Sequence, residues 1–579
     1  MYTHTLPTTG AISFSDFLIT SDLVSQVSQA TELRSGLRAV LKECRAGDNQ
    51  SDDGCVDWLR IVKAVEDYLP HLFAIFNCIQ TDDLILRYEP QFSWRTTLSS
   101  TLFRSPPRIA LPGIYYEMCS TLLLHGVALC NFAASATASL GQYERDRRLS
   151  DAERKVKDDK LRWAADTLCR ACGIFEHLSQ NLIPQWEAQV GRIDGRPPDM
   201  TREVTLALSK LALAEAQTLA IRKLLSPSLS LAVDTTTPGP PLPKSHPSAS
   251  LLAKLHLFVA SHFESARSLA GIAGKKTATS SRSSDFGSYH RTPMSSSKDT
   301  VDGRDATTRE GKKAVFGKLR SLASRDTSAS SSSRSAAAAS LGADAATDAD
   351  LEVGAPLLRY IASCADLHRA LAYKWLGVDA GEAGGRIGEA IAFLRMARDG
   401  LEGGSSGRLT AALRERSSKE ARDELRTVRE EELRTVEHWL RSYGKLNDTV
   451  SFQPIPKASE LQTRIPAGRA ALDPRPYRHP VPAFGPGSPG FQSEGMKRAV
   501  MVGGGTGPPD VGVPPVVLER PGPQVGPPTV PITAARGEAP ETDGIDGACD
   551  DPSQLAFGGL SIGKARDEAE QYAGAGAYY

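Results

Sequence analysis

A long apolar run in the first third of the chain constrains its fold most strongly. Residues 114–134, IYYEMCSTLLLHGVALCNFAA, place apolar side chains on every side of a helix. Such a helix has no polar face, so neighbouring helices or lipid must cover it. A membrane-spanning helix needs about 20 mainly apolar residues, but Glu117, His125 and Asn131 interrupt this run. The run therefore predicts the central helix of a large, soluble, helical body.

Helical patterns continue on both sides of this run, and residues 1–225 look continuously helical. Apolar residues at helical spacing follow one another in most segments, and Pro70 is expected to break or kink the helix that contains it. The sequence thus predicts an all-α fold. Besides the central helix, we expect helices at residues 57–79, 150–181, 200–225, 249–272, 352–369, 370–401 and 417–443.

Three regions are not expected to join the helical body. Loops at about 226–248 and 275–349 would interrupt a domain at 1–475, and the Pro/Gly-rich residues 476–579 would form a disordered tail. These regions hold few large apolar residues. They cannot bury enough surface to offset the entropy of ordering, about 1–2 kcal/mol per residue for the backbone.

The insertion at 275–349 is also locally basic. Residues 275–334 hold thirteen Lys or Arg against six Asp or Glu, among many serines. A solvated insertion explains this composition. A contact with an acidic membrane surface, tuned by phosphorylation, explains it too.

Composition excludes some classes of function. The chain carries 68 basic and 68 acidic residues, so no overall positive charge favours nucleic acid as a partner. The nine cysteines are odd in number and scattered through helical segments, which does not indicate a disulfide framework. The N-terminus lacks the basic and apolar regions of a secretory signal. We expect a cytoplasmic protein with reduced thiols.

No segment assembles a convincing catalytic, cofactor or metal site. Cys169 and Cys172 form a C-x-x-C in a helical pattern, without a second C-x-x-C or a paired histidine. The glycines of 502–509 lack the Lys-Ser/Thr of a phosphate-binding loop. His125 lies in the most apolar helix and is expected to be a core histidine. The sequence predicts a protein that is not an enzyme, with no catalytic residue, cofactor or metal.

A helical hairpin supports a binding function instead. Residues 370–397, ALAYKWLGVDAGEAGGRIGEAIAFLRMA, resemble a tetratricopeptide helix–turn–helix, in which Ala and Gly permit close packing. One such pair cannot stand alone and must stack on other helices. Long helical scaffolds act by presenting faces and grooves to a partner's helix or extended peptide.

Five segments, in this order, resemble the BRO domain, the helical domain of the ESCRT-associated protein ALIX and its relatives. The segment LALAEAQ resembles the family's Leu-Ala-Gln helix, and GEAIAFL resembles its Gly-Glu-x-Ile-Ala-x-Leu element. The resemblance covers roughly residues 5–475, apart from the insertions. The five segments are YYEMCSTLLLHGVALCN (115–131), LRWAADTLCRACGIFEHL (161–178), LSKLALAEAQTLAIRK (208–223), GEAIAFLRMA (388–397) and NDTVSFQPIP (447–456).

The resemblance implies a boomerang-shaped helical solenoid with a tetratricopeptide-like core. Its concave side would bind the C-terminal amphipathic helix of the filament-forming ESCRT-III subunit. Within the family the chain looks most like the fungal branch that acts in ambient alkaline-pH signalling. A member of that branch would be a non-enzymatic adaptor, needed with the other components of the Pal complex for proteolytic activation of the transcription factor PacC. It would be recruited peripherally to plasma or endosomal membranes.

Candidate partner-binding residues are Leu206, Leu211 and Leu213, on the segment that resembles the family's partner-binding helix. Apolar anchors of this kind bind the apolar side of an amphipathic helix. Ordinary core packing is the alternative for each of the three leucines. Two alternative functions also stay open: a general endosomal, multivesicular-body sorting adaptor of the ALIX type, and a hydrolase using Cys169 or His125.

Overall fold

The fold is known from a computed structural model of the chain. It describes residues 1–47, 56–99, 106–146, 148–191, 193, 195–231, 240–282, 353–403, 416–489 and 491. Most of the basic insertion and of the tail predicted from the sequence lies outside these residues.

The described chain is mainly α-helical, as predicted. The helices are α1 (Val24–Gly47), α2 (Trp58–Gln80), α3 (Ile114–Ala138), α4 (Asp151–His177), α5 (Ile183–Val190), α6 (Arg202–Leu231), α7 (Ala249–Arg282), α8 (Ala355–Glu382), α9 (Ile387–Gly403), α10 (Arg416–Leu446) and α11 (Ala458–Leu461). Helix α2 continues through Pro70, where a break or kink was expected. A capping box of Ser150 and Glu153 begins α4.

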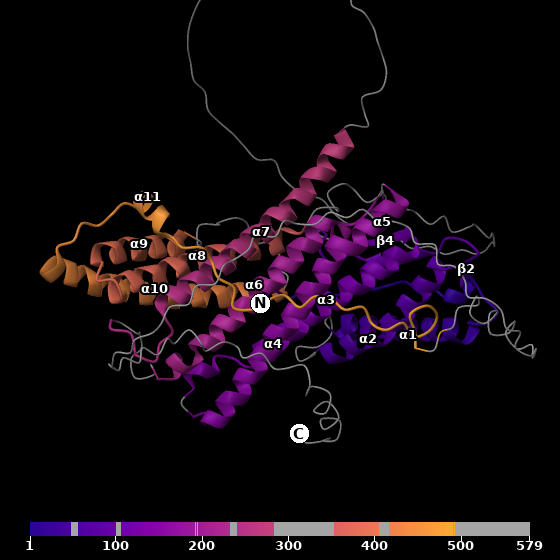
Figure 1. Ribbon diagram of the computed structural model, residues 1–579, viewed down its shortest axis with the longest axis horizontal. Coiled ribbons are helices and arrows are strands. Elements are labelled where there is room, and N and C mark those ends of the chain that lie inside the picture. The colour runs from indigo at the N-terminus through magenta and orange to yellow at the C-terminus, as the bar shows by residue number, and fades with distance from the viewer. Residues whose placement is uncertain are drawn as a thin grey trace, which may run out of the picture. The chain divides into compact units, whose positions relative to one another are not determined.

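The long helices form a solenoid in which each packs mainly on the next. The order of contact is α3, α4, α6, α7, α8, α9 and α10 (Figure 1). Their buried side chains form one contiguous hydrophobic core. Because each helix has neighbours on two sides, apolar residues are needed around much of its circumference.

Helix α3 is the central helix that the sequence predicted. It is long and apolar enough to cross a membrane, but 83% of its most apolar stretch is buried inside the protein. The polar residues that interrupt it, Glu117, His125 and Asn131, are buried as well. Neighbouring helices, and not lipid, therefore cover this helix.

The tetratricopeptide-like hairpin consists of α8 and α9. One helix spans the predicted boundary at 369/370, and the turn lies at residues 383–386 instead. A Cβ added to Gly377 would lie 2.8 Å from Leu394 Cγ and 3.0 Å from Ala390 O. Only glycine permits this approach, which confirms the close packing expected of the pair.

Two small antiparallel sheets near the N-terminus were not predicted. Strand β1 (Leu18–Ile19) pairs with β2 (Ile85–Leu86), and β3 (Gln91–Arg95) pairs with β4 (Arg108–Pro112). The first sheet is only two residues long on each strand. Such a segment is too short to show the alternation of apolar and polar residues from which strands are recognised.

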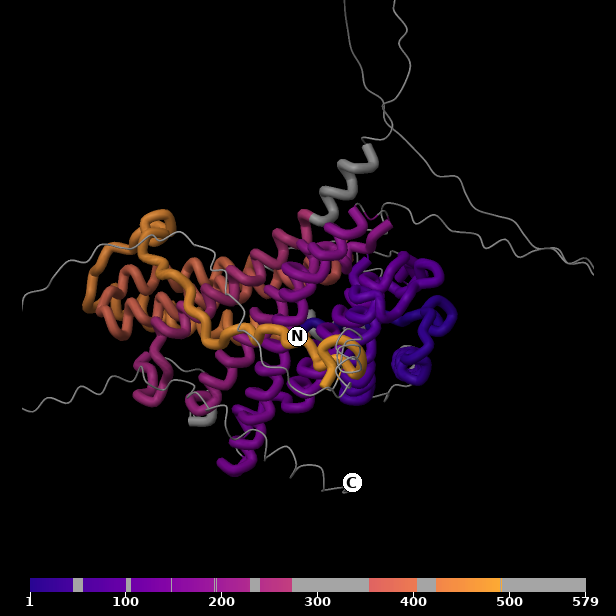
Figure 2. Tube along the Cα trace, turned by 45° about the vertical axis from the view of Figure 1, so that its right-hand side comes forward, coloured from indigo at the N-terminus to yellow at the C-terminus, as the bar shows by residue number. Residues whose placement is uncertain are grey.

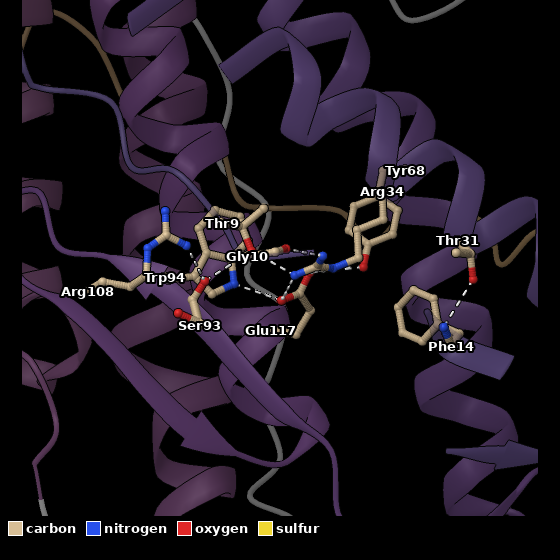
Figure 3. A network of polar contacts seen from close by, with 10 residues as sticks. All are labelled: Thr9, Gly10, Phe14, Thr31, Arg34, Tyr68, Ser93, Trp94, Arg108 and Glu117. Carbon is tan, nitrogen blue, oxygen red and sulfur yellow. Dashed lines mark hydrogen bonds and ion pairs between the residues drawn. The ribbon is translucent and has the colours of Figure 1, made fainter. Parts of the chain in front are cut away.

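A buried ion pair ties this N-terminal region to α3 (Figure 3). Arg34 on α1 and Glu117 on α3 are 1% and 0% exposed, with Nε of Arg34 2.8 Å from Oε1 of Glu117. Tyr68 OH and Trp94 Nε1 also donate to the Glu117 carboxylate, at 3.1 and 2.7 Å. Arg34 Nη1 donates to Gly10 O at 2.8 Å. Each of these charged groups therefore has hydrogen-bonding partners, as a charge buried this deeply requires.

Residues 453–488 form an extended strap across one series of helices, shown in orange in Figure 2. It follows the π-helical turn Asn447–Ser451 and contains α11. Hydrogen bonds fix it successively to α9, α7, α6, α4 and α2: Gly388 N to Gln453 Oε1 (3.2 Å), Arg469 N to Lys254 O (3.0 Å), Gln217 Nε2 to Leu472 O (2.6 Å), Arg475 N to Cys169 O (3.2 Å), Ala483 N to Pro70 O (3.1 Å) and Asn77 Nδ2 to Pro486 O (3.2 Å).

The strap extends the ordered chain beyond residue 475, where the sequence placed the start of the tail. Phe484 is buried, and His479 packs its ring 5.0 Å from that of Phe73. Likewise, α6 continues to Leu231, past the predicted loop start at about 226. The predicted boundaries at 475 and 226 are thus too early.

Candidate partner-binding surfaces

The three leucines predicted as partner anchors lie on α6, between α4 and α7. Leu211 and Leu213 are 2% and 5% exposed, so both belong to the core. Leu206 is half-buried and retains some accessible surface. The prediction is therefore wrong for Leu211 and Leu213 as surface anchors, and Leu206 is the remaining candidate of the three.

Leu211 and Leu213 are buried because α6 has neighbours on most of its sides. Gln217 binds the strap, and Glu215 accepts hydrogen bonds from Tyr2 N and Tyr360 OH, both at 2.8 Å. Contacts therefore surround the helix beyond its two packing partners. The sequence of such a helix therefore does not show which of its apolar residues face the surface.

Sequence reasoning missed a cluster of exposed apolar side chains at the end of α10, which we call the tip cluster. Its members are Leu446 (38% exposed), Val450 (68%), Phe452 (73%) and Ile455 (37%). Large apolar side chains gathered at the surface often mark binding sites. The segment SFQPIP was informative as a family motif, but its sequence alone does not show that Phe452 points outward.

The backbone around Phe452 is held in an unusual conformation. Phe452 has φ 48° and ψ 32°, a left-handed conformation that costs a non-glycine residue about 1–2 kcal/mol. Asn447 fixes the turn through both ends of its amide, donating to Gln453 O at 3.1 Å and accepting from Gln453 N at 3.0 Å. The Gln453 amide also donates to Gly385 O at 2.9 Å. The exposed aromatic ring is thus presented by a well-supported turn, as suits an anchor for a partner's apolar pocket.

Of the two side chains named in the hydrolase alternative, Cys169 lacks the properties of a reactive nucleophile. Cys169 is 2% exposed, and burial raises the pKa of its thiol to about 12. Burial also raises the pKa of Cys172, whose Sγ lies 3.3 Å from Ser209 Oγ. A reactive cysteine needs a lowered pKa and access to solvent. His125 is 5% exposed and lies 3.5 Å from Glu66 on α2.

Among the described residues, no group of three or more His, Cys, Asp or Glu side chains is placed to hold a metal ion. The seven cysteines in this part of the chain are free thiols.

A buried pair of histidines joins α7 to α8 and predicts acid sensitivity. Nδ1 of His256 lies 2.9 Å from Nδ1 of His368, and burial lowers the pKa of His368 to about 4 and that of His256 well below its usual value. Because of the lowered pKa, the unfolded chain binds more protons than the folded chain below pH 6.5. The free energy of unfolding is therefore highest above pH 6.5 and decreases as the pH falls toward 4. The slope of the unfolding free energy against pH reflects the difference in bound protons between the unfolded and folded chain. We expect His256→Asn to lower that difference by about one proton. Urea unfolding between pH 7 and pH 4 measures this slope, and an unchanged slope would contradict the assignment.

Among proteins of known structure, the chain is similar to two structures of ALIX. ALIX in complex with the SIVmac239 PYKEVTEDL late domain has a TM-score of 0.48 at 15% identity, covering 83% of this chain and 49% of that one. An ALIX BRO1 complex with CHMP4C has a TM-score of 0.43 at 15% identity, covering 83% and 96%. The chain thus spans about half of the longer ALIX structure.

Comparison of sequences gives closer relatives. The BRO1-like domain family matches residues 28–480. The pH-response regulator protein palC of Cryptococcus neoformans is 34% identical over 517 residues, which is 85% of this chain and 94% of that protein. The palC protein of Emericella nidulans is 24% identical over 536 residues, covering 82% and 88%. The chain therefore belongs to the BRO1-like domain family, and it is similar to palC pH-response regulators.

Proposed function

We propose that this protein is a non-enzymatic adaptor in the ambient alkaline-pH signalling of fungi. The observation that carries the proposal is the 34% identity with a palC pH-response regulator over 94% of that protein's length. In this role the protein acts with the other components of the Pal complex and is needed for proteolytic activation of the transcription factor PacC. It works in the cytoplasm and is recruited peripherally to plasma or endosomal membranes.

The partner in this proposal is the C-terminal helix of the filament-forming ESCRT-III subunit. Membership of the BRO1-like domain family supports this choice. An amphipathic helix binds through a few apolar anchors surrounded by polar residues, and Leu206 is the accessible one of the three leucines on α6. The strap occupies one side of α6 at Gln217, which restricts where a partner helix can approach.

Leu206→Asp is expected to weaken binding of that helix by about tenfold or more, since it places a charge in an apolar contact. The melting temperature should stay nearly unchanged because the side chain is only half-buried. Fluorescence polarisation with the labelled helix measures the affinity, and circular dichroism measures the melting temperature.

Two further variants make the result specific. Val156→Asp, at a 68% exposed position on α4, is the control and should bind normally. Phe452→Ser tests the tip cluster as an alternative anchor. Normal binding by Leu206→Asp would contradict the role of Leu206, and collapse of the fold would show that Leu206 belongs to the core.

Gene deletion separates the proposed function from its alternative. A pH-signalling adaptor is required for growth at alkaline pH and for PacC processing. A general sorting adaptor of the ALIX type is required for multivesicular-body cargo sorting at any pH. Loss of cargo sorting at acidic pH with normal PacC processing would favour the sorting adaptor and overturn the proposal.

A further inference from the structure

The β1–β2 sheet carries a second exposed apolar surface, which we call the sheet patch. The strand register places Ile19 opposite Ile85 and Leu18 opposite Leu86. Tyr88 follows β2, and its ring lies 6.3 Å from that of Phe17. The members of the patch are Ile19 (45% exposed), Ile85 (59%), Leu86 (39%) and Tyr88 (54%).

Both residues of β2 are exposed, although neighbouring residues in a strand point to opposite faces. The short ladder therefore offers apolar side chains on more than one face. Exposed apolar side chains beside the unpaired edge of a small sheet favour the binding of another chain segment.

Acidic residues flank both strands of the sheet patch in sequence. The exposed charged residues within a few positions of the two strands are Asp16, Asp22, Asp82, Asp83 and Glu89, together with Arg87. The excess of carboxylates repels an anionic lipid surface and favours a segment with positive charge. An occupant that fits this surface is apolar at its centre and basic at its edge.

The strap ends close to this surface. A Cβ added to Gly485 would lie 2.2 Å from Cys78 Sγ, and Asn77 donates to Pro486 O at 3.2 Å. The carbonyl of Cys78 in turn accepts a hydrogen bond from Leu84 N at 3.1 Å, and Leu84 directly precedes β2. The end of the strap therefore lies close to the sheet patch, a few residues before Phe491, the last residue that the structure describes.

The sequence that follows has the composition that the sheet patch requires. Residues 496–502, MKRAVMV, place Lys497 and Arg498 beside an apolar run and contain no acidic residue. The nine residues that follow Phe491, up to Val500, extend at most about 30 Å from it.

We propose that residues 496–502 dock on the sheet patch. Val500 and its apolar neighbours cover Ile85, while Lys497 and Arg498 pair with Asp82 and Asp83. The contact joins the C-terminal tail to the N-terminal sheet and continues the path of the strap. Any basic partner that binds the sheet patch has to displace this segment first.

Disulfide trapping in the full-length chain tests the proposal. In a background with Cys44, Cys55 and Cys549 changed to Ser, Ile85→Cys is combined with Val500→Cys and oxidised with copper–phenanthroline. Because docking raises the local concentration of the two thiols, we expect the intramolecular cross-link to form about tenfold faster than in the control pair Val156→Cys with Val500→Cys. Equal rates for both pairs would overturn the proposal.

A charge exchange makes the test specific. Asp82→Lys with Asp83→Lys should reduce the cross-linking rate to that of the control pair. Adding Lys497→Glu with Arg498→Glu should restore it. Failure of the exchange to restore the rate would contradict the pairing, and a cross-link found only between two chains would assign the sheet patch to a second copy instead.

Discussion

Arg34→Met is expected to lower the free energy of unfolding by about 3–5 kcal/mol, because it leaves the Glu117 carboxylate buried without its counter-charge. Glu117 is 0% exposed, and its remaining donors are the neutral Tyr68 hydroxyl and Trp94 indole. Arg34 also donates to Thr9 Oγ1 at 2.7 Å, so the substitution loosens the N-terminal segment as well. Urea unfolding followed by circular dichroism measures the loss.

An exposed ion pair nearby provides the control. Arg60 and Glu43 lie 2.8 Å apart on α2 and α1, with their side chains 54% and 58% exposed. Because solvent screens such pairs, Arg60→Met should cost less than about 1 kcal/mol. Similar small effects of both substitutions would show that the Arg34–Glu117 pair does not hold the N-terminal region to α3.

Gly173→Ala is expected to detach the strap from α4. The added Cβ would lie 1.8 Å from Arg475 O and 2.9 Å from its carbonyl carbon, so the strap backbone has to move. Overpacking of this kind costs about 1–3 kcal/mol. Amide hydrogen exchange is the most direct measurement of whether the strap is detached. Protection of the amides of Arg475 and Ala483, which donate to Cys169 O and Pro70 O, should fall in the variant.

Gly36 on α1 is the matched control, because an added Cβ there meets nothing within 4 Å. Alanine has the higher helix propensity, so Gly36→Ala should stabilise the protein by up to about 1 kcal/mol. If Gly173→Ala behaved in the same way, with the strap still protected, the close approach of strap and helix would be wrong.

Regular periodicity made the long helices predictable. The all-round apolar pattern of 114–134 identified α3 as the central helix, and the Ala- and Gly-rich residues 370–397 identified the α8–α9 hairpin. Strands β1 and β2 could not be predicted, because two residues carry no periodicity. The predicted boundary at 369/370 was wrong because α8 continues without a break from Ala355 to Glu382.

The strap shows why composition alone misjudged the tail. Residues 474–487, PRPYRHPVPAFGPG, have the proline and glycine content of a disordered segment. However, proline favours an extended backbone, and the aromatic side chains of Tyr477 and Phe484 find places against α4 and α2. The order of this segment depends on contacts with helices far away in sequence, which its own residues do not reveal.

The candidate sites were predicted only in part. The apolar pattern on α6 selected the right type of residue, but Leu211 and Leu213 face the core because α6 has neighbours on most sides. Phe452 and Ile85 were missed because exposure of a single apolar side chain depends on the tertiary structure. In both cases the sequence determines the chemistry of the residue, while the fold determines whether it is accessible.

The most direct test of the proposed function is the affinity of the full-length protein for the C-terminal helix of the same organism's filament-forming ESCRT-III subunit. Fluorescence polarisation with the labelled helix, at physiological salt, gives this value. We expect saturable binding with a dissociation constant in the micromolar range, about −8 kcal/mol, that Leu206→Asp weakens and Val156→Asp does not. No saturable binding by a folded sample would contradict the proposal that this BRO1-family protein acts through ESCRT-III.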